Sequence, residues 1–370
     1  MASDSGIPTG PARARRSAGN HEPLGVAVIG VGMMGEFHTR VLSEIHDARL
    51  IAVADVVESR AREIAGRYGA EVWTTDYSSL LERDDIEAVW ICTPDHLHKE
   101  PTVAAAAAGK HVLLEKPMAT TLADADTIIG AVEQAGITFM VGHIYRFEVH
   151  FAKLKQAIES GNIGKPVSYY GRQNTTLADG RYINGRVGIN FFLSVHGFDM
   201  MSWCLGKKPV SIYSTPVLGT LHEEIGVPDG VWSLVKFEDG VVGCDEAFWI
   251  LADSIANWRT PEDWGAFFNT GDFRWEVLGT LGSCYLEFPP TVARMIDQEG
   301  WKFAETKIAP ILHGRVVGAL REEIQHFCAC VREGKQPAIT PREARQAVEL
   351  ALAAERSAAI GGPVALPLEP

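Results

Sequence analysis

Short apolar segments alternate with helical stretches from about residue 24 onward. The apolar segments are LGVAVIG, RLIAVAD, IEAVWICTP, KHVLLEKP and ITFMVGHIYRF. Strands that alternate with helices are typical of βαβ units, which build a parallel sheet. The pattern therefore predicts an α/β domain over residues 23–145. Residues 1–22 are rich in Gly, Pro, Ser and Arg and lack apolar periodicity, so they are predicted to be a mobile tail.

A different pattern follows between about residues 165 and 310, where apolar and polar positions alternate, as in GVWSLVKFEDGVVGCDEAFWI. The Asp-Gly pair at 239 and 240 predicts a hairpin turn between two such strands. A chain of 370 residues is also longer than one core usually serves. We therefore predict a second domain over residues 146–340. A closing helix beginning near Arg342, with Thr340 as its cap and Pro341 as its first residue, is predicted to pack back on the body within 341–370.

Composition and charge narrow the class of protein. Hydrophobic residues make up 46% of the chain and charged residues 22%, as in soluble globular proteins. The net charge of -13 argues against nucleic acid or an anionic membrane surface as a partner. The chain lacks both an apolar run of about 20 residues and a hydrophobic signal core, so we expect a cytoplasmic protein. The six cysteines show no CxxC spacing, which predicts reduced thiols and no metal site.

The first strand leads directly into GVGMMG, which places Gly30, Gly32 and Gly35 in the GxGxxG spacing, with Met33 and Met34 between them. Glycines here permit a tight turn and a close approach of pyrophosphate to the backbone. The following helix contributes unpaired N–H groups and the positive end of its dipole. Because the motif follows a strand and opens a helix, it predicts a dinucleotide site.

Asp55 ends the second strand, 20 residues after Gly35, where the dinucleotide fingerprint requires an acid. Its carboxylate can accept hydrogen bonds from the adenosine ribose hydroxyls, whereas a 2′-phosphate would meet a like charge. NAD is therefore favoured over NADP. Arg60 and Arg62 are near enough in sequence to keep NADP as the alternative.

Other chemically distinctive residues stand where a predicted strand ends. They are Thr93 and Pro94, then Lys116, and then His143, Tyr145 and Arg146. In open α/β sheets ligands bind outside the carboxyl ends of the strands. The pattern therefore gathers these residues at the mouth of the cofactor site.

The chain resembles a known family on these and later segments: the glucose-fructose oxidoreductase, inositol dehydrogenase and rhizopine-catabolism (Gfo/Idh/MocA) dehydrogenases. The matching segments are GVGMMGEFHTR, VAD, CTPDHLHKE, LLEKP, YRFEVHFAKLKQAIESGNIGKPVSYYG, HGFDMMSWCLG, FEDGVVGCDEAFW, EVLGTLGSCYLEF and EEIQHFCACVREGKQPAITPREARQAVELALAAERSA. They span roughly residues 24 to 365. The resemblance implies a Rossmann-type dinucleotide-binding domain followed by an α+β domain with a large, mostly antiparallel open sheet. It also implies a homodimer or homotetramer that forms through that sheet.

For Lys116 the resemblance implies the role of catalytic acid/base. Oxidation of an alcohol by hydride transfer leaves a proton, and a lysine that is partly desolvated beside a positive nicotinamide should have a lowered pKa. Glu115 is expected to orient this lysine or the nicotinamide amide. Thr93, Pro94 and His98 match positions that line the cofactor in the family, although His98 is also compatible with a structural place at a helix start.

The second catalytic element is expected in NFFLSVHGFDMMSWCLG. Many family members carry an aspartate four residues before a histidine, but here Phe192 takes the aspartate position before His196. His196 can still relay a proton or bind a substrate hydroxyl, and Asp199 is expected to orient its ring. A purely structural histidine is the alternative. Phe192 adds an apolar surface, so no particular family specificity carries over.

Several further residues are candidate substrate contacts. By position they are Tyr145, Arg146, Arg172 and Asn174, although Arg146 is equally suited to brace the interdomain junction. Indole rings stack well on the C–H faces of sugars. The tryptophans of the second half are therefore weaker candidates, because such residues more often fill a core or an interface: Trp232, Trp249, Trp258, Trp264, Trp275 and Trp301.

The sequence thus predicts an NAD-dependent oxidoreductase that acts on a secondary hydroxyl of a small-molecule sugar, sugar derivative or cyclitol. Three alternatives share its motifs. They are an NADP-linked sugar or anhydrosugar reductase, a glycosidase that uses NAD for transient oxidation, and a non-catalytic nucleotide-sensing regulator. An intact Glu-Lys-Pro motif speaks against the regulator, which needs no acid/base.

Overall fold

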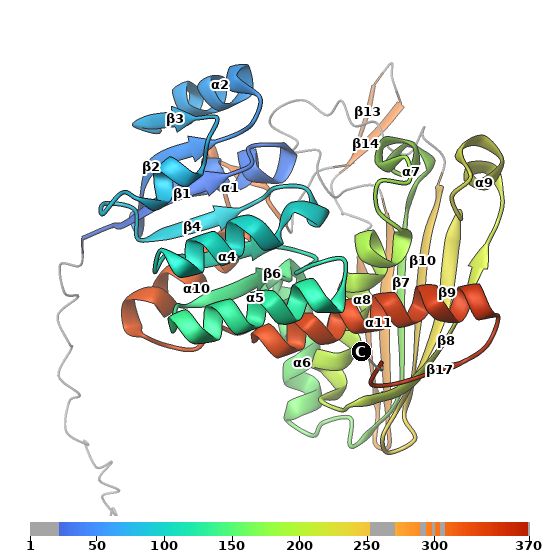
Figure 1. The fold of residues 1–370 in the computed structure, drawn as a ribbon. Coiled ribbons are helices and arrows are strands. Elements are labelled where there is room, and N and C mark those ends of the chain that lie inside the picture. The colour runs from blue at the N-terminus through green and yellow to red at the C-terminus, as the bar shows by residue number, and fades with distance from the viewer. Residues whose placement is uncertain (1–21, 252–270, 289–293, 298–299, 304–307, 369–370) are drawn as a thin grey trace, which may run out of the picture.

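A computed structural model describes residues 22–251, 271–288, 294–297, 300–303 and 308–368. Two sheets stand side by side, with helices between them and around the first (Figure 1). The predicted tail lies almost entirely outside the described residues. No helix of the described ranges is long and apolar enough to cross a membrane.

The first sheet is parallel, in the order β3-β2-β1-β4-β5-β6. Its strands are β1 Leu24–Ile29, β2 Ala48–Ala54, β3 Val72–Thr74, β4 Ala88–Ile91, β5 His111–Glu115 and β6 Phe139–Gly142. Its helices are α1 Met33–Glu44, α2 Glu58–Tyr68, α3 Ser78–Leu81, the 3-10 turn η1 Asp95–Leu97, α4 Lys99–Ala107 and α5 Leu122–Ala135. The predicted parallel sheet is confirmed, and β3 is one strand more than the sequence predicted.

The second sheet has seven strands in the order β12-β11-β7-β10-β9-β8-β17. They are β7 Pro166–Thr176, β8 Pro209–Val217, β9 Gly230–Phe237, β10 Val242–Leu251, β11 Asp272–Gly279, β12 Ser283–Phe288 and β17 Val364–Ala365. All neighbours are antiparallel except β7 and β10. The mostly antiparallel sheet is confirmed, and the predicted Asp-Gly turn joins β9 to β10, with Gly240 at φ +87°.

The remaining elements connect and cover the two sheets. Two short ribbons pair β13 Arg294–Asp297 with β14 Gly300–Phe303, and β15 Ile311–Leu312 with β16 Arg315–Val316. The helical elements are η2 Ile144–Phe147, α6 Val149–Glu159, α7 Leu177–Ile183, the π-helical η3 Asn190–Ser194, α8 Val195–Leu205, α9 Thr220–Ile225, α10 Ala319–Glu333 and α11 Pro341–Ile360.

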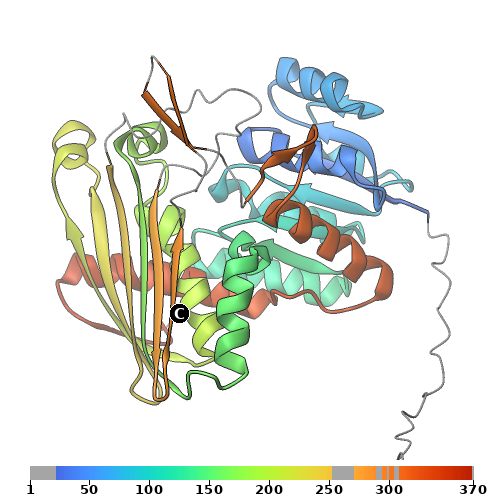
Figure 2. The ribbon, with the colours of Figure 1, turned by 180° about the vertical axis from the view of Figure 1, so that it is seen from behind.

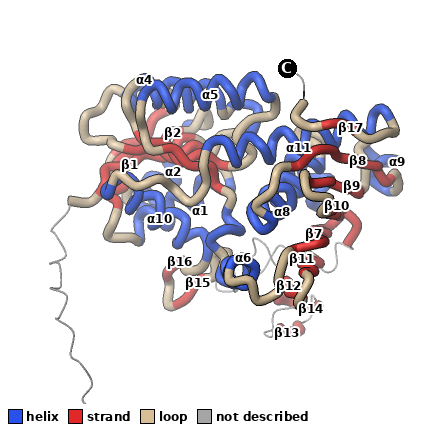
Figure 3. The backbone as a smooth tube through the Cα atoms, turned by 90° about the horizontal axis from the view of Figure 1, so that it is seen from below, coloured by secondary structure: helices blue, strands red, loops and turns tan. Residues whose placement is uncertain are grey.

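Helices α8 and α11 lie between the two sheets, as the view along the strands shows (Figure 3). Helix α11 contacts α5 at one end and β8 at the other, so the end of the chain packs back across both halves. Its start follows the sequence prediction, because Thr340 and Glu343 form a capping box and Pro341 is the first residue. This arrangement brings α8 to the carboxyl edge of the parallel sheet.

Candidate active site

The glycine turn after β1 is shaped for close approach of a ligand. Gly30 has φ +84°, and a Cβ there would lie 2.8 Å from the backbone of Cys92 and Thr93. A Cβ on Gly35 would meet the Gly30 carbonyl oxygen at 1.9 Å. For a Cβ built on Gly32, the nearest atom in the described part of the chain is Nη1 of Arg60, at 3.9 Å. Two glycines thus serve tight packing, and the third leaves space, as a pyrophosphate at a helix start requires.

Asp55 is fixed beside this turn at the end of β2. One carboxylate oxygen accepts a hydrogen bond from the Val31 amide and the other from the Val57 amide, each at 2.9 Å. The side chain stays partly exposed. Each carboxylate oxygen can accept more than one hydrogen bond, so the residue fits the predicted ribose contact. Together with the glycine turn, these residues fit a dinucleotide.

The loops after β4 and β5 are joined through His98. Its Nδ1 lies 2.7 Å from the Pro117 carbonyl oxygen, and its Nε2 lies 2.9 Å from the Thr93 carbonyl oxygen. Burial lowers the pKa of His98, so the neutral ring donates to one carbonyl at a time. Both ring nitrogens therefore face backbone, and His98 braces the loops that carry Thr93, Pro94 and Lys116.

Lys116 follows β5 and reaches toward α8. Its ammonium group donates to the Phe192 carbonyl oxygen at 3.0 Å and lies 4.8 Å from the centre of the Phe192 ring. Burial lowers the pKa of Lys116, against the opposing charges of Glu115 and Asp95. Phe192, at the position where the resemblance led us to expect an aspartate, thus contacts the ammonium group of Lys116 through both its carbonyl oxygen and its ring.

Glu115 is buried directly before Lys116 and is held from two sides. His38 Nε2, on α1, lies 2.8 Å from one oxygen, and the Lys116 amide donates to the other at 3.1 Å. Burial raises the pKa of Glu115, but His38 and Lys116 outweigh it and the net shift is downward. Glu115 is therefore the anion behind Lys116, and His38 is a partner that the sequence did not single out.

His196 lies on α8 with its ring against Tyr145, at a centroid distance of 4.7 Å. The histidine and the tyrosine are both buried. Burial, followed by the charges of Lys116 and His143, lowers the pKa of His196 well below its ordinary value. The structure thus brings together a neutral imidazole, Lys116 and Tyr145.

Asp199 does not orient His196, contrary to the sequence prediction. Both of its oxygens accept from Arg146, at 2.9 and 2.6 Å, in a fully buried pair. Arg146 also donates to the Ala338 carbonyl oxygen at 3.3 Å and to Glu343 at 2.9 Å. Arg146 therefore joins η2, α8 and the start of α11, which is the bracing alternative that the sequence left open for it.

Arg172 and Asn174 are not at the site either. Both bind Glu246, Arg172 at 3.1 Å and Asn174 at 2.9 Å. Glu246 points away from the helices, because its neighbour Asp245 packs against Gly197 of α8. Strand residues alternate between the two faces of a sheet, so these two side chains lie on the face turned away from α8. The structure therefore places both side chains away from Lys116 and His196, and their role as substrate contacts stays a prediction.

The tryptophans are mainly packing residues. Trp249 and Trp275 are fully buried, and Trp249 lies 6.1 Å from the Phe192 ring. Trp232 is 38% exposed but stands on the outer face of β9. Trp258 and Trp264 lie outside the described residues, and for Trp301 only the strand is described. None of the three whose side chains are described lies at the site as an open platform.

His143, which the sequence predicted at the mouth of the cofactor site because it follows a strand, is buried close to His196. It is 1% exposed, and neither ring nitrogen has a hydrogen-bond partner among the described residues. Its Nδ1 lies 3.9 Å from Asp199, and its ring is 6.5 Å from that of His196. Its place directly after β6, next to the strand of Lys116, is the signal that was available.

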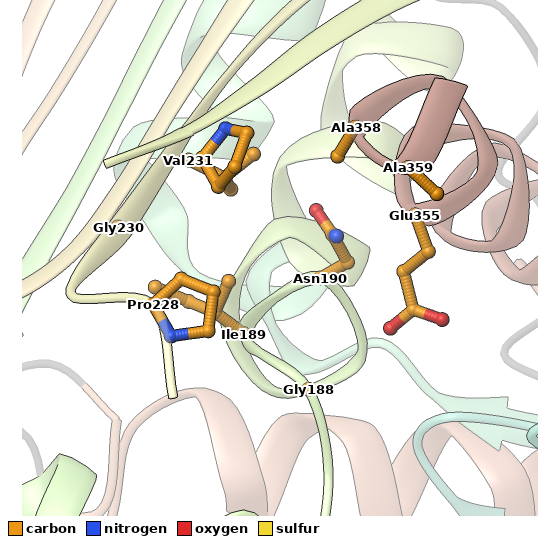
Figure 4. Close-up of a pocket in the computed structure, with 10 residues that line it drawn as sticks. Gly188, Ile189, Asn190, Pro228, Gly230, Val231, Glu355, Ala358 and Ala359 are labelled. Carbon is orange, nitrogen blue, oxygen red and sulfur yellow. The ribbon is translucent and has the colours of Figure 1, made fainter. Parts of the chain in front are cut away.

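A cavity of about 320 Å³ opens beside η3 and is separate from these groups. Its walls are mostly apolar, with Asn190 and Glu355 as the polar exceptions (Figure 4). Lys116 and His196 do not line it. The cavity therefore contributes no residue to the group formed by Lys116, His196 and Tyr145.

Residues 24–143 match the oxidoreductase family with an NAD-binding Rossmann fold, and residues 151–285 match the Gfo/Idh/MocA C-terminal domain. The chain belongs to the Gfo/Idh/MocA oxidoreductase family. The resemblance predicted from the sequence is confirmed, and so is NAD as the cofactor of the parallel-sheet domain.

Full-length relatives agree with this assignment. The scyllo-inositol 2-dehydrogenase (NAD(+)) of Bacillus subtilis is 30% identical over 92% of this chain and 95% of its own length. The myo-inositol 2-dehydrogenase of Thermotoga maritima is 30% identical over 90% of this chain and 95% of its own. The solved myo-inositol 2-dehydrogenase of Lactobacillus plantarum has a TM-score of 0.79 at 24% identity, covering 93% of this chain and 99% of that one, which supports the fold.

Proposed function

We propose that this protein oxidises a secondary hydroxyl of a cyclitol or sugar with NAD, and that Lys116 is the acid/base. The observation that carries the proposal is the position of Lys116. It stands at the carboxyl edge of the parallel sheet, with a lowered pKa, beside Glu115 and within electrostatic reach of the neutral His196. The names of the inositol dehydrogenase relatives support a cyclitol as the substrate class.

The division of labour follows from the residues present. NAD held by the glycine turn and Asp55 would supply the hydride acceptor for the carbon that carries the hydroxyl group. Lys116, in its neutral form, accepts the hydroxyl proton at Nζ, and Glu115 stabilises the ammonium group that results. His196 contributes a hydrogen bond to the substrate. The parallel-sheet domain would therefore bind the cofactor, and α8 would contribute the residues that face the substrate.

Phe192 makes this pocket less polar than the family pattern implies. Its ring lies over Lys116 where an aspartate would add a hydrogen-bond acceptor. We propose that the substrate presents an apolar ring face toward Phe192 and its hydroxyls toward His196. This preference separates the chain from relatives that carry the aspartate.

A substrate panel tests the proposed activity. Cyclitols, sugars and glycosides are offered to protein stripped of cofactor, and absorbance at the NADH band is followed. Formation of NADH with cyclitols or sugars supports the dehydrogenase. Hydrolysis of glycosides without net NADH would indicate the glycosidase, and faster turnover with NADP would indicate the NADP-linked reductase.

Cofactor preference should depend on Asp55. The Asp55→Asn variant keeps an acceptor for the backbone but loses the negative charge, so its affinities for NAD and NADP should converge. Asp55→Ala should also reduce the difference between the affinities for NAD and NADP. It should in addition destabilise the glycine turn, because two backbone amides lose their hydrogen-bond acceptor. Calorimetric titration of both cofactors measures the difference between their affinities, and the variant Asp76→Ala, at an exposed position, serves as control. Tighter binding of NADP by the unmodified protein would contradict the ribose assignment.

His196 should affect turnover more than substrate binding. For His196→Asn we expect kcat to fall by at least about tenfold, since a positioned group near the transferred proton is lost. Because its pKa is lowered, His196 is neutral where Lys116 titrates, so the acidic limb of the pH profile should keep its position. Steady-state kinetics across pH measure both, with the exposed His222→Asn as control. An unchanged kcat with a raised KM would limit His196 to binding.

The outer face of the second sheet supports a second copy of this chain as partner. This face carries partly exposed apolar side chains across five strands, and helices cover the opposite face. They are Tyr213, Trp232, Leu234, Val242, Leu278 and Tyr285. Large apolar side chains that are left exposed on a sheet face are typical of a subunit contact. We propose that it forms the homodimer or homotetramer interface.

A further inference from the structure

Glu323 reaches the active-site edge from a distant part of the chain. It lies on α10, which packs against α1 and η2 on the face of the parallel sheet that is turned toward the viewer in Figure 2. Phe327, one turn further along α10, meets Trp90 of β4 edge to face at 5.3 Å. The helix is therefore seated on the sheet, and the position of Glu323 is fixed by packing.

The carboxyl group of Glu323 is buried next to that of Glu115. Glu323 is 0% exposed. A Cβ placed on Gly142, the last residue of β6, would lie 3.2 Å from Oε1 of Glu323 and 3.6 Å from Oε1 of Glu115. The two acids thus meet at the carboxyl end of β6. Neither oxygen of Glu323 has a hydrogen-bond partner in the described part of the chain.

The surrounding groups leave Glu323 without a counter-charge. Among the described residues, His38 is engaged with Glu115, the ammonium group of Lys116 donates to the Phe192 carbonyl oxygen, and His143 lies toward Asp199. The nearby thiol of Cys92 has a pKa raised by burial and by both acids. Burial, and then the charge of Glu115, raise the pKa of Glu323 well above its ordinary value. A buried carboxyl in this setting holds its proton, because a second unpaired anion would be costly.

The place of Glu323 relative to the cofactor follows from the sheet order. Asp55 ends β2 and marks the adenosine side, so the other half of a dinucleotide extends over β4, β5 and β6. Gly142 ends β6 on that side. The oxidised nicotinamide ring carries a positive charge, which the reduced ring lacks. Oxidised cofactor therefore brings a positive charge to the edge where Glu323 holds its proton.

We propose that Glu323 is a charge-compensating acid of the cofactor site, protonated in the free protein and ionised when the oxidised cofactor binds. The O–H bond of the Glu323 carboxyl breaks, the proton passes to solvent, and the carboxylate stays as a second anion beside Glu115. Binding of NAD⁺ is then coupled to proton release, and binding of NADH is not. The cofactor part of this inference rests on the NAD site, and it does not require the acid/base role proposed for Lys116.

The experiment measures protons rather than activity. NAD⁺ and NADH are titrated by calorimetry into the Lys116→Met variant, in buffers of different ionisation enthalpy, at a mildly alkaline pH. Removing Lys116 excludes its own titration from the signal. We expect fractional proton release with NAD⁺, none with NADH, and an affinity for NAD⁺ that rises with pH by up to about tenfold per pH unit. Adding Glu323→Gln should abolish the release, whereas the exposed neighbour Glu322→Gln should leave it.

An infrared measurement needs no change at Glu323. The carbonyl stretch of a protonated carboxylic acid should be present in the cofactor-free Lys116→Met protein and decrease when NAD⁺ binds. The measurement is made above the pH at which Asp245, whose pKa is raised to about 7, has ionised. The proposal would be overturned by equal proton release with NAD⁺ and NADH, or by proton release that persists in Glu323→Gln. It would also be overturned by a carboxylic acid band that does not change when NAD⁺ binds. None of these outcomes bears on whether Lys116 is the acid/base.

Discussion

Replacing Lys116 by methionine should lower turnover by about 10²-fold or more while leaving NAD affinity nearly unchanged, because a positioned acid/base typically contributes at least this much. Its side chain contacts the Phe192 carbonyl and ring and carries no described contact to the glycine turn. Stopped-flow or steady-state formation of NADH measures the rate, and calorimetry measures the affinity.

The acid/base role of Lys116 also predicts the direction in which kcat/KM changes with pH. In the direction of oxidation the neutral amine is the active form, so kcat/KM should rise with pH through the pKa of Lys116. Burial lowers that pKa, so the rise should lie below the ordinary value for lysine. Lys116→Arg keeps the charge but cannot lose its proton near neutral pH, and it should be as slow as the methionine variant. The exposed Lys153→Met serves as control. Wild-type rates in Lys116→Met would remove the lysine from the chemistry, and loss of folding would make its role structural.

The sequence predicted the cofactor half of the site because that half is local. The glycine turn, Asp55 and Lys116 each stand directly after a strand, and parallel strands bring such ends together whatever the rest of the chain does. Strand β3 was missed because it has only three residues, Val72–Thr74, at the sheet edge, with no apolar run to mark it.

The substrate half was harder to predict because it depends on which face each element buries. Arg172 and Asn174 alternate with Gln173, and polar residues occur on both faces of this strand. Only the packing of Asp245 against Gly197 decides which face meets α8. Glu323 presents a related case. It sits beside the exposed Glu322, but it shares the apolar side of α10 with Leu320, Ile324 and Phe327, and an acid on that side is the signal that it is buried.

Arg146→Met should reduce the free energy of unfolding by about 3–5 kcal/mol, because it leaves the buried carboxylate of Asp199 without its partner. The arginine and the aspartate side chains are each 2% exposed, so solvent does not compensate the loss. Urea unfolding at neutral pH measures the change. Arg345→Met is the matched control. Its ion pair with Asp126 also involves α11 but is partly exposed, and its loss should cost no more than about 1 kcal/mol.

Two further measurements distinguish the effect of leaving Asp199 charged without a partner from the effect of losing the packing of the Arg146 side chain. The double variant Arg146→Met with Asp199→Asn has no buried charge and should recover part of the stability that Arg146→Met loses. The effect of pH has a definite sign. Arg146 outweighs burial and holds the pKa of Asp199 below its ordinary value, so the contribution of the pair is present near neutral pH and is lost as the pH falls through that lowered pKa. In Arg146→Met the carboxyl takes up a proton at a higher pH, so the difference between the two proteins should shrink on acidification. A difference that is constant with pH, together with no recovery in the double variant, would show that Arg146 acts by packing alone and that Asp199 does not depend on it.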